Sequence, residues 1–293
     1  MALKETTFNN EFKVTDQIKS DFDEAGYIII RELLDKEELL KVKEALEHTD
    51  AVTQHAFEVK DGKSGKSRLC LWNHPGNDLT GMVGRCEKVV TTTEKLLGGE
   101  VYHYHTKLMM KEAYTGGAHV WHQDYGYWYK NGCLFPDMVT VFIAIDKCWK
   151  ENGCLQILQG SHKCGRIEHL MVGGQTGADM VRLEELKKVL PLQYVELEPG
   201  DALFFHCNLL HASSPNESSH RRWAFLCAYN RASNNPVFKH HHPQYTPLVK
   251  YTPLVKVPDS SIKNCSNITD TSDKDFMDPT QDKTIVAEKM ENN

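Results

Sequence analysis

The sequence has no Cys-x-x-Cys pair, and its nine cysteines are odd in number and scattered from Cys70 to Cys265. This pattern argues against a disulfide framework and against a zinc knuckle, and it predicts a reducing compartment. The chain also lacks an apolar run of the roughly 18 to 20 residues that cross a bilayer. Its first residues, MALKETTFNNEF, show neither an apolar signal core nor an arginine-rich amphipathic pattern. We therefore expect a cytoplasmic protein without a membrane span.

Long runs of lysine or arginine are absent too, and the net charge is −6. A chain of this balance does not offer the basic stripe that follows a phosphate backbone or an anionic membrane. The partner we expect is a small soluble substrate, with no nucleic acid and no membrane, and the sequence does not indicate an oligomeric state. At 293 residues, the chain fits one large domain or a domain with a tail.

The N-terminal part, residues 14–47, predicts two helices with a strand between them. Thr15 or Asp16 can cap a first helix that ends at Gly26, and Asp35 can cap a second. The intervening YIIIREL is short and apolar, which is typical of a buried strand.

A different pattern begins at about residue 101, where short strand-like runs alternate with turn residues. These runs are VYHYHTKLMM, VTVFIAID, CLQILQ, QYVELE, DALFFH and AFLCAYN. They predict a mainly β fold with flanking helices, a double-stranded β-helix (jelly roll, cupin-like) over about residues 101–230. The stretch 176–189 reads as a helix inserted in this pattern, and the polar segment 58–80 reads as a long loop.

After Val257 the composition turns to Ser, Thr, Asp, Lys and Asn with few aromatic residues. Such a segment buries too little apolar surface to offset its ordering entropy. We expect one domain over residues 1–257 and a disordered polar tail over 258–293. The tandem YTPLVK repeat of residues 245–256 is too short for a solenoid unit and indicates a local duplication.

One His-x-acid triplet, His122-Gln123-Asp124, is a candidate for two limbs of an iron facial triad. Roughly two such triplets are expected by chance from 15 histidines and 40 acidic residues, and two occur. The other, at His48, ends a predicted helix, where residues i and i+2 point apart. His122 lies in a strand region, where they share a side. A third ligand, His211, then follows within GDALFFHCNLLHASSPN.

Other histidines compete for the third position. His206 lies nearby, but packing or hydrogen bonding at its strand end accounts for it. His119 precedes the triplet on a glycine-rich turn, and the run His240–His242 suits a solvated or supporting loop. A zinc site stays a rival, although a structural zinc site usually recruits cysteine and none is placed to close it.

Several ordered motifs resemble those of the phytanoyl-CoA dioxygenase family, and within it the branch of ectoine and free-amino-acid (proline) hydroxylases. The matching segments are DFDEAGYIIIREL, VWHQDYGYW, ENGCLQILQGSHK and PGDALFFHCNLLHASSPN, followed by Arg221-Arg222. The resemblance covers roughly residues 14–257. It implies a jelly roll that binds Fe(II) through His122, Asp124 and His211, which are then the catalytic centre.

The resemblance also implies roles for residues around the metal. Arg222 matches the arginine that pairs with the distal carboxylate of 2-oxoglutarate, and its fixed fork of donors suits a carboxylate; Arg221 is the adjacent alternative. Ser213 matches a serine that helps to bind the oxo-acid. His105, which we group with the cofactor-binding residues, stands where ectoine hydroxylase has a glutamine, and Lys107 stands where it has an arginine. These two departures put ectoine itself in doubt as the substrate.

For the substrate, the resemblance points to a small amino or imino acid such as proline. Trp128 matches an aromatic of the substrate pocket, Tyr125 and Tyr127 extend that wall, and Lys107 can meet a carboxylate. Arg68, in SRLCLWNHPGND, can receive an α-carboxylate or can instead stabilise a surface loop. The implied co-substrates are 2-oxoglutarate and O2, with ascorbate as a candidate activator, and the reaction is hydroxylation of an aliphatic C–H bond.

Three other functions stay open. An acyl-CoA hydroxylase of the same family requires a basic path for the CoA phosphates, which the acidic balance disfavours. A non-catalytic metal-binding jelly roll is favoured by loss of a triad residue, and none is lost. A hydrolase that uses zinc-bound water predicts activity without 2-oxoglutarate. Halogenation is disfavoured because the carboxylate position, Asp124, is filled.

Overall fold

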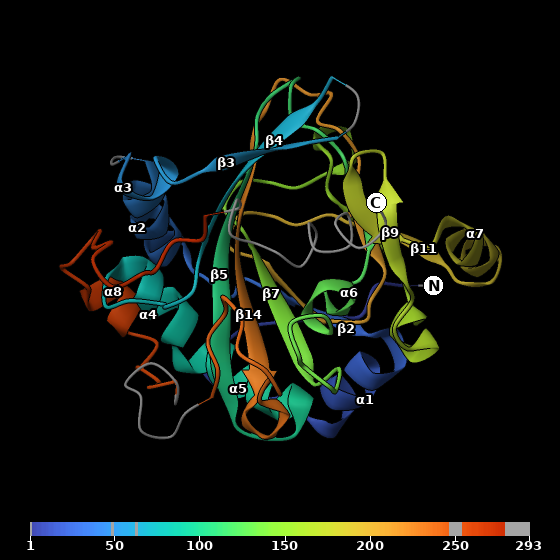
Figure 1. Cartoon of the computed structure of the whole chain (residues 1–293). Helices are drawn as coiled ribbons and strands as arrows, with labels where there is room; N and C mark the ends of the chain where they lie inside the picture. Colours follow the sequence, from blue (N-terminus) through green and yellow to red (C-terminus); the bar gives the residue numbers. More distant parts are fainter. Residues whose placement is uncertain (1, 48–49, 62–63, 246–253, 279–293) are drawn as a thin grey trace.

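A computed structural model describes residues 2–47, 50–61, 64–245 and 254–278, and most of its strands belong to two sheets (Figure 1). The larger sheet has eight strands, in the order β1 (Glu5–Thr7), β2 (Tyr27–Arg31), β12 (Ala202–His206), β7 (Met138–Ala144), β14 (Arg222–Arg231), β5 (Val101–Lys111), β4 (Lys66–Trp72) and β3 (Phe57–Lys60). The smaller sheet has four, in the order β11 (Leu192–Val195), β8 (Leu155–Leu158), β13 (His211–Ser213) and β6 (His119–His122). A separate ribbon pairs β9 (His169–Val172) with β10 (Gln175–Ala178).

The strands are antiparallel neighbours except for β1 and β2, which run parallel. One hydrophobic cluster joins the inner faces of the two sheets, with Ile29 and Phe142 from the larger sheet and Ile157 from the smaller. Two antiparallel sheets packed over a shared core are the arrangement that the sequence predicted. Each of the six strand-like runs from residue 101 onward coincides with one strand of these sheets, although some runs extend beyond the strand by one to three residues.

The outer face of the larger sheet is covered by helices. Alternation along β2 sends Tyr27 and Ile29 into the space between the sheets and Ile28 and Ile30 to the other side, where a second cluster forms. This explains why β2 reads as a continuous apolar run, since both of its faces are buried. Figure 1 shows α2, α4 and α8 gathered on one side of the strands β5, β14 and β7, and β9 and β11 on the other. The helices are α1 (Asp16–Ala25), α2 (Lys36–Glu47), α3 (Asp50–Thr53), α4 (Leu79–Arg85), α5 (Glu87–Leu97), α6 (Tyr125–Trp128), α7 (Met180–Val189) and α8 (Ser261–Asn264).

The predicted N-terminal helices are confirmed together with their caps. Thr15 accepts a hydrogen bond from the Ile18 backbone at the start of α1, and Gly26 ends that helix in a left-handed conformation. The Asp35 side chain accepts from the first backbone N–H groups of α2. Each cap satisfies donors that a helix cannot satisfy internally.

Two local predictions were wrong. Residues 58–80, expected to be one long loop, contain most of β3 and all of β4, which extend the larger sheet beyond β5. The apolar residues of SRLCLW are buried against the sheet, which outweighs the polar and glycine content around them. The helix expected over 176–189 begins at Met180, because residues 176–178 pair with β9 and Asp179 caps α7.

The tail prediction was wrong for residues 258–278, which pack on the body of the protein. Ile262 of α8 is fully buried in the outer cluster, and Phe276 stacks on His55 with ring centroids 3.9 Å apart. Lys274 is fully buried in an ion pair with Asp78. A few anchoring side chains thus order a segment whose average composition is polar. Residues 279–293 and most of the YTPLVK repeat lie outside the described residues.

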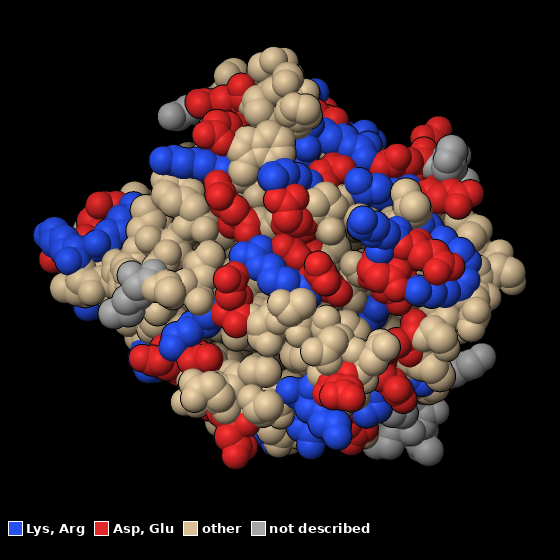
Figure 2. Space-filling view, turned by 180° about the vertical axis from the view of Figure 1, so that it is seen from behind, with Lys and Arg blue, Asp and Glu red and all other residues tan. Residues whose placement is uncertain are grey.

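All nine cysteines are free thiols in this structure, and seven of them are buried. None of the described helices is both long and apolar enough to cross a membrane. The face seen in Figure 2 carries basic and acidic side chains side by side. Among the described residues on that face, the basic side chains therefore form no continuous stripe.

Candidate active site

The three predicted metal ligands converge at one end of the smaller sheet. His122 is the last residue of β6, and His211 is the first residue of β13 and pairs directly with it across the antiparallel ladder. Asp124 follows two residues after His122 at the start of α6. One ligand atom from each of the three side chains lies within 4.8 Å of the others. Residues that are distant in the sequence are thus brought together by one pair of strands.

Backbone hydrogen bonds orient both imidazoles. The Nδ1 of His122 lies 2.7 Å from the carbonyl of Val120, and the Nδ1 of His211 lies 2.9 Å from the carbonyl of Leu209. Since a carbonyl only accepts, each Nδ1 carries the proton and each Nε2 keeps a lone pair. Both Nε2 atoms lie 3.9 Å from the same oxygen of Asp124.

Two further features fit the site to a cation. Burial lowers the pKa of His122 and of His211, which keeps both imidazoles neutral and able to coordinate. The second carboxylate oxygen of Asp124 accepts a 2.6 Å hydrogen bond from the Thr140 hydroxyl on β7. This leaves the first oxygen for a metal. Two neutral histidines and one carboxylate form the donor set of a non-haem iron centre with open positions.

The two adjacent arginines have opposite surroundings. Arg221 forms ion pairs with Glu47 and with Asp146 and lies over the ring of Trp223. Arg222, the first residue of β14, is fully buried, and its Nε and Nη2 have no hydrogen-bond partner among the residues that the structure describes. Unpaired donors of a buried guanidinium are costly, so they indicate a site for an anion.

Ser213 lies beside this guanidinium region on β13. Its Oγ accepts a 2.9 Å hydrogen bond from Lys111, which is buried at the end of β5. In the sheet, Lys111 pairs directly with Arg222. The predicted oxo-acid residues Arg222 and Ser213 thus adjoin a second buried cation.

Comparison with known proteins identifies the family. The family model for phytanoyl-CoA dioxygenase (PhyH) matches residues 22–224. The chain belongs to the phytanoyl-CoA dioxygenase family. It is 29% identical over 253 residues to an L-proline trans-4-hydroxylase of Streptomyces griseoviridis, covering 79% of this chain and 92% of that protein. It is 25% identical over 236 residues to an ectoine dioxygenase of Stutzerimonas stutzeri, covering 75% of this chain and 78% of the relative.

Solved structures confirm the fold. The structure of EctD from S. alaskensis with 2-oxoglutarate and 5-hydroxyectoine superposes with a TM-score of 0.69 at 20% identity, covering 86% of this chain and 90% of that one. The predicted family, jelly-roll class and enzyme class are therefore confirmed, and the chain is a 2-oxoglutarate-dependent dioxygenase of the phytanoyl-CoA dioxygenase family.

In this family member, β5 supplies one wall beside the metal ligands. Alternation along the strand places His105, Lys107, Met109 and Lys111 on one face. Burial lowers the pKa of Lys107, and the negative charge of Asp124 opposes that shift. No hydrogen bond or ion pair to Lys107 is formed by the described residues, so its ammonium is available to a ligand.

Trp128 and His105 lie together on this wall. The two rings are 5.7 Å apart, and His105 also lies 4.9 Å from the ring of His242. His242 is buried, with its Nδ1 2.9 Å from the Asn73 amide oxygen. Of the two alternatives for the His240–His242 run, a solvated loop or a supporting one, His242 fits the supporting one. These contacts place His105 with the predicted substrate wall.

Arg68 is not in the pocket. It lies on β4 opposite Met110, and directly paired residues of antiparallel strands point to the same side of a sheet. Met110 belongs to the outer cluster, so Arg68 faces away from Lys107, and it donates to the Thr53 carbonyl at 3.1 Å. Its predicted substrate contact is therefore wrong, because the segment expected to be a long loop contains a strand whose register fixes the direction of Arg68.

Tyr125 also differs from the prediction. It is buried, and its hydroxyl donates to the Cys133 carbonyl at 2.9 Å. Tyr127 is the tyrosine next to the metal ligands, with its ring 5.8 Å from that of His122 and its hydroxyl donating to the Thr176 carbonyl. The four-residue helix α6 turns these neighbouring tyrosines in different directions, which the sequence alone does not specify.

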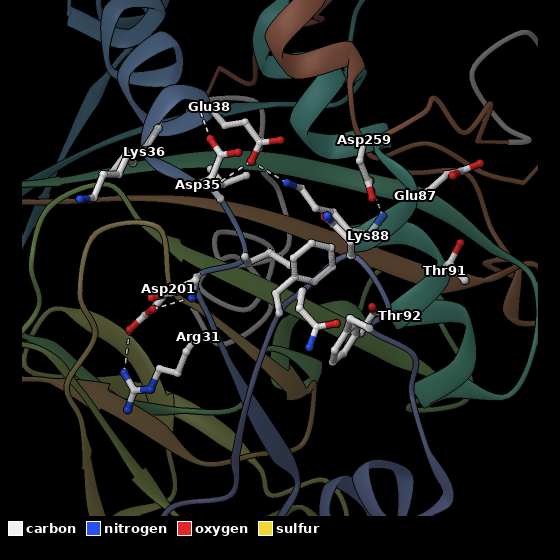
Figure 3. A pocket seen from close by; sticks show the side chains of 18 of the residues that line it. Arg31, Asp35, Lys36, Glu38, Glu87, Lys88, Thr91, Thr92, Asp201 and Asp259 are labelled. Carbon is white, nitrogen blue, oxygen red and sulfur yellow. Dashed lines mark hydrogen bonds and ion pairs between the residues drawn. The ribbon is translucent and has the colours of Figure 1, made fainter.

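A separate groove of about 1540 Å³ lies on the helical side, and none of the predicted site residues lines it (Figure 3). Four of its charged side chains satisfy one another in two ion pairs. Lys88 pairs with Glu38 at 2.6 Å and Arg31 with Asp201 at 2.7 Å. The charges of these four residues are therefore not free to bind a ligand. The site formed by His122, Asp124 and His211 remains the candidate active site.

The sequence analysis missed two residues of the site, Thr140 and Lys111. Thr140 gives no local signal, because only tertiary packing brings it to Asp124. Lys111 had a usable signal, since strand alternation places it on the face of His105 and Lys107. His119, considered in the sequence only as a metal ligand, pairs with Ser213 across a register shift that alternation does not predict. Both ring nitrogens of His119 are buried, with no hydrogen-bond partner in the described part of the chain, and positive charge from Lys111 and Arg222 adds to the burial that lowers its pKa.

Proposed function

We propose that the enzyme hydroxylates an aliphatic C–H bond of a free amino or imino acid such as proline, with Fe(II), 2-oxoglutarate and O2. The observation that carries this proposal is the convergence of His122, Asp124 and His211 beside a buried guanidinium with unpaired donors. The sequence similarity to an L-proline trans-4-hydroxylase supports a small amino-acid substrate.

The metal ligands and the oxo-acid residues have separate roles. The Nε2 atoms of His122 and His211 and one oxygen of Asp124 hold the iron, which supplies the activation of O2. Arg222 binds the distal carboxylate of 2-oxoglutarate, and Ser213 donates to the same group. By fixing the oxo-acid in one orientation, these two residues make its decarboxylation to succinate productive.

Substrate recognition falls to the opposite wall. Lys107 binds the carboxylate of the amino acid, because its ammonium is otherwise unpaired and partly desolvated. Trp128 and His105 pack against the apolar part of the substrate, and Tyr127 borders the metal ligands. The wall thus fixes which C–H bond faces the oxidant, and this orientation decides the product.

The test begins with metal-free protein under anaerobic conditions. Adding Fe(II) and 2-oxoglutarate is expected to produce a weak visible charge-transfer band. In air, a panel of free amino acids, with proline among them, is then scored by succinate release. An amino acid that raises succinate above the substrate-free rate and gains one oxygen atom by mass supports the proposal.

Two results would overturn it. Turnover that continues without 2-oxoglutarate indicates hydrolysis by a metal-bound water. Stimulation by acyl-CoA thioesters and by none of the amino acids indicates the acyl-CoA branch of the family.

Replacement of Arg222 by alanine is expected to weaken 2-oxoglutarate binding by about 2 to 5 kcal/mol, because a buried hydrogen-bonded charge pair is lost. Anaerobic titration of the charge-transfer band measures this change. Arg221→Ala is the matched control, since Arg221 is paired with Glu47 and Asp146 away from the site, and it should bind the oxo-acid normally. The reverse outcome would show that the oxo-acid assignment is off by one residue.

A further inference from the structure

The chain that follows β14 returns to the substrate wall formed by His105, Lys107 and Trp128. His242 is buried there, with its ring centroid 4.9 Å from that of His105 and 4.6 Å from that of Tyr104. The match to the family model ends at residue 224. His242 is therefore added to this wall by a part of the chain that lies outside that match.

A β-bulge in β5 forms the surface on which His242 packs. The register of β5 with β14 shifts at this point, and Tyr104 is the extra residue of β5. Adjacent strand residues normally point to opposite faces, and a bulge overrides this alternation. The rings of Tyr104 and His105 both lie near Trp128, at 5.5 Å and 5.7 Å. Two neighbouring rings of one strand thus contact the same wall.

Asn73, the residue after β4, sets the tautomer of His242. The Nδ1 of His242 lies 2.9 Å from the Asn73 Oδ1. The Asn73 Nδ2 donates to the His241 carbonyl and to the Asp275 carboxylate, both at 2.8 Å. A carbonyl and a carboxylate only accept, so a rotated amide would lose both bonds. The oxygen of Asn73 therefore faces His242, and the Nδ1 of His242 carries the proton.

The Nε2 of His242 is left as an unused acceptor. No hydrogen bond to it is formed by the described residues. Burial lowers the pKa of His242 well below its ordinary value, and positive charge on Lys107 adds to this effect. The imidazole therefore stays neutral and Nε2 keeps its lone pair. On the same wall, the Nδ1 of His105 is buried and has no partner among the residues that the structure describes.

A second metal site is the alternative use of these clustered histidines. Within the described part of the chain, the group His122, Asp124 and His211 is the one whose ligand atoms lie close enough together for an ion. His105 and His242 therefore have no third ligand for a metal, and a hydrogen-bonding role remains.

An amino acid carries two groups that complement this wall. Its carboxylate complements the ammonium of Lys107, and its positively charged nitrogen needs an acceptor that is not itself a cation. Asp124 is not that acceptor, because one of its oxygens is bonded to Thr140 and the other is left for the metal. A neutral imidazole with a free lone pair meets the need.

We infer that His242 is a specificity-determining residue: its Nε2 accepts a hydrogen bond from the nitrogen of the amino or imino acid whose carboxylate binds Lys107. This inference rests on the proposed amino-acid substrate and assigns its second polar contact. A carboxylic acid without the nitrogen would leave the buried acceptor unsatisfied, so the pocket discriminates against it.

The experiment compares L-proline with cyclopentanecarboxylate, in which a CH2 group replaces the nitrogen, in the His242→Asn protein. The asparagine amide can still donate to Asn73, but it does not reach the position of Nε2. The KM for L-proline, measured by succinate release, should rise by about 10- to 100-fold, the range expected for losing a hydrogen bond to a charged group. The inhibition constant of cyclopentanecarboxylate should not change. If L-proline does not stimulate the wild type, the amino acid that releases the most succinate replaces it, with the analogue that has CH2 in place of its nitrogen.

His242→Gln is the rescue variant. Its amide oxygen can occupy the position of Nε2, so its KM for L-proline should lie closer to that of the wild type. The affinity for 2-oxoglutarate, from the anaerobic charge-transfer band, should be unchanged in both variants. His220→Ala is the control, because His220 is an exposed histidine beside the ring of Trp149, and it should change none of these values.

Equal weakening of L-proline and cyclopentanecarboxylate in His242→Asn would indicate a merely structural histidine and would overturn the inference, as would an unchanged KM. If His242→Asn does not fold, His242→Leu serves instead, because leucine fills the space without an acceptor; the same selective loss is expected. A wild type that none of the amino acids stimulates would refute the proposed substrate class itself, so the two failures are distinguishable.

Discussion

The His211→Ala protein should lose the anaerobic charge-transfer band and all succinate release. Alanine at position 211 leaves only one imidazole, that of His122, and one carboxylate, that of Asp124, to hold the metal. His211 and His122 pair directly across β13 and β6. Loss of a ligand's supporting hydrogen bond alone costs about 10- to 100-fold in metal affinity. Loss of the ligand itself should exceed that, and direct titration with Fe(II) measures it.

His206→Asn is the control for this experiment. His206 lies five residues earlier in the same segment, but its Nδ1 accepts from the Asn208 backbone and its ring packs against Phe22 and His162. An asparagine oxygen can replace that acceptor. The control should keep the band and the metal affinity of the wild type. A band that survives in His211→Ala, or disappears in His206→Asn, would mean that the third ligand has been wrongly assigned.

The Lys274→Met protein should lose about 3 to 5 kcal/mol of unfolding free energy, because its partner Asp78 would remain charged, buried and unpaired. The Lys274 Nζ lies 2.8 Å from Asp78 and 2.8 Å from the Thr80 hydroxyl, and neither charged side chain is exposed. Asp78 also caps α4 through the Gly81 backbone. Urea unfolding followed by circular dichroism measures the loss.

Lys263→Met is the matched control from the same C-terminal segment. Lys263 pairs with Asp35 at the surface, with both side chains partly exposed, and exposed pairs contribute about 1 kcal/mol or less. If both variants unfold at the same urea concentration, residues 258–278 do not hold the body of the protein in the way described.

The metal ligands could be predicted because each of them stands in a short, recognisable sequence motif. His122 and Asp124 are only two residues apart, with His122 at the end of β6 and Asp124 at the start of α6, so no distant contact is needed to bring them together. His211 stands in a motif that ends one strand and begins another, so its position is tied to a turn. The helix caps at Thr15 and Asp35 were readable for the same reason, since a cap depends on its next three residues.

The local sequence could not show toward which side of the sheet a side chain points. Arg68 and Lys107 are both cations of the larger sheet, but the β4–β5 register turns one toward the helices and the other toward the site. The choice between Arg221 and Arg222 depends on which of them meets Glu47 and Asp146. Such partners are distant in the chain, and no periodicity identifies them.

The chain by itself determined the donor chemistry of the metal centre, the jelly-roll class and the family, because these depend on residue types at short spacings repeated in a fixed order. Tertiary structure alone decided the pairing of Lys111 with Arg222, the support of Asp124 by Thr140 and the burial of the C-terminal segment. The physical reason is that burial and charge pairing are set by groups from separate strands, and the free energy of a polar side chain depends on what lies opposite it.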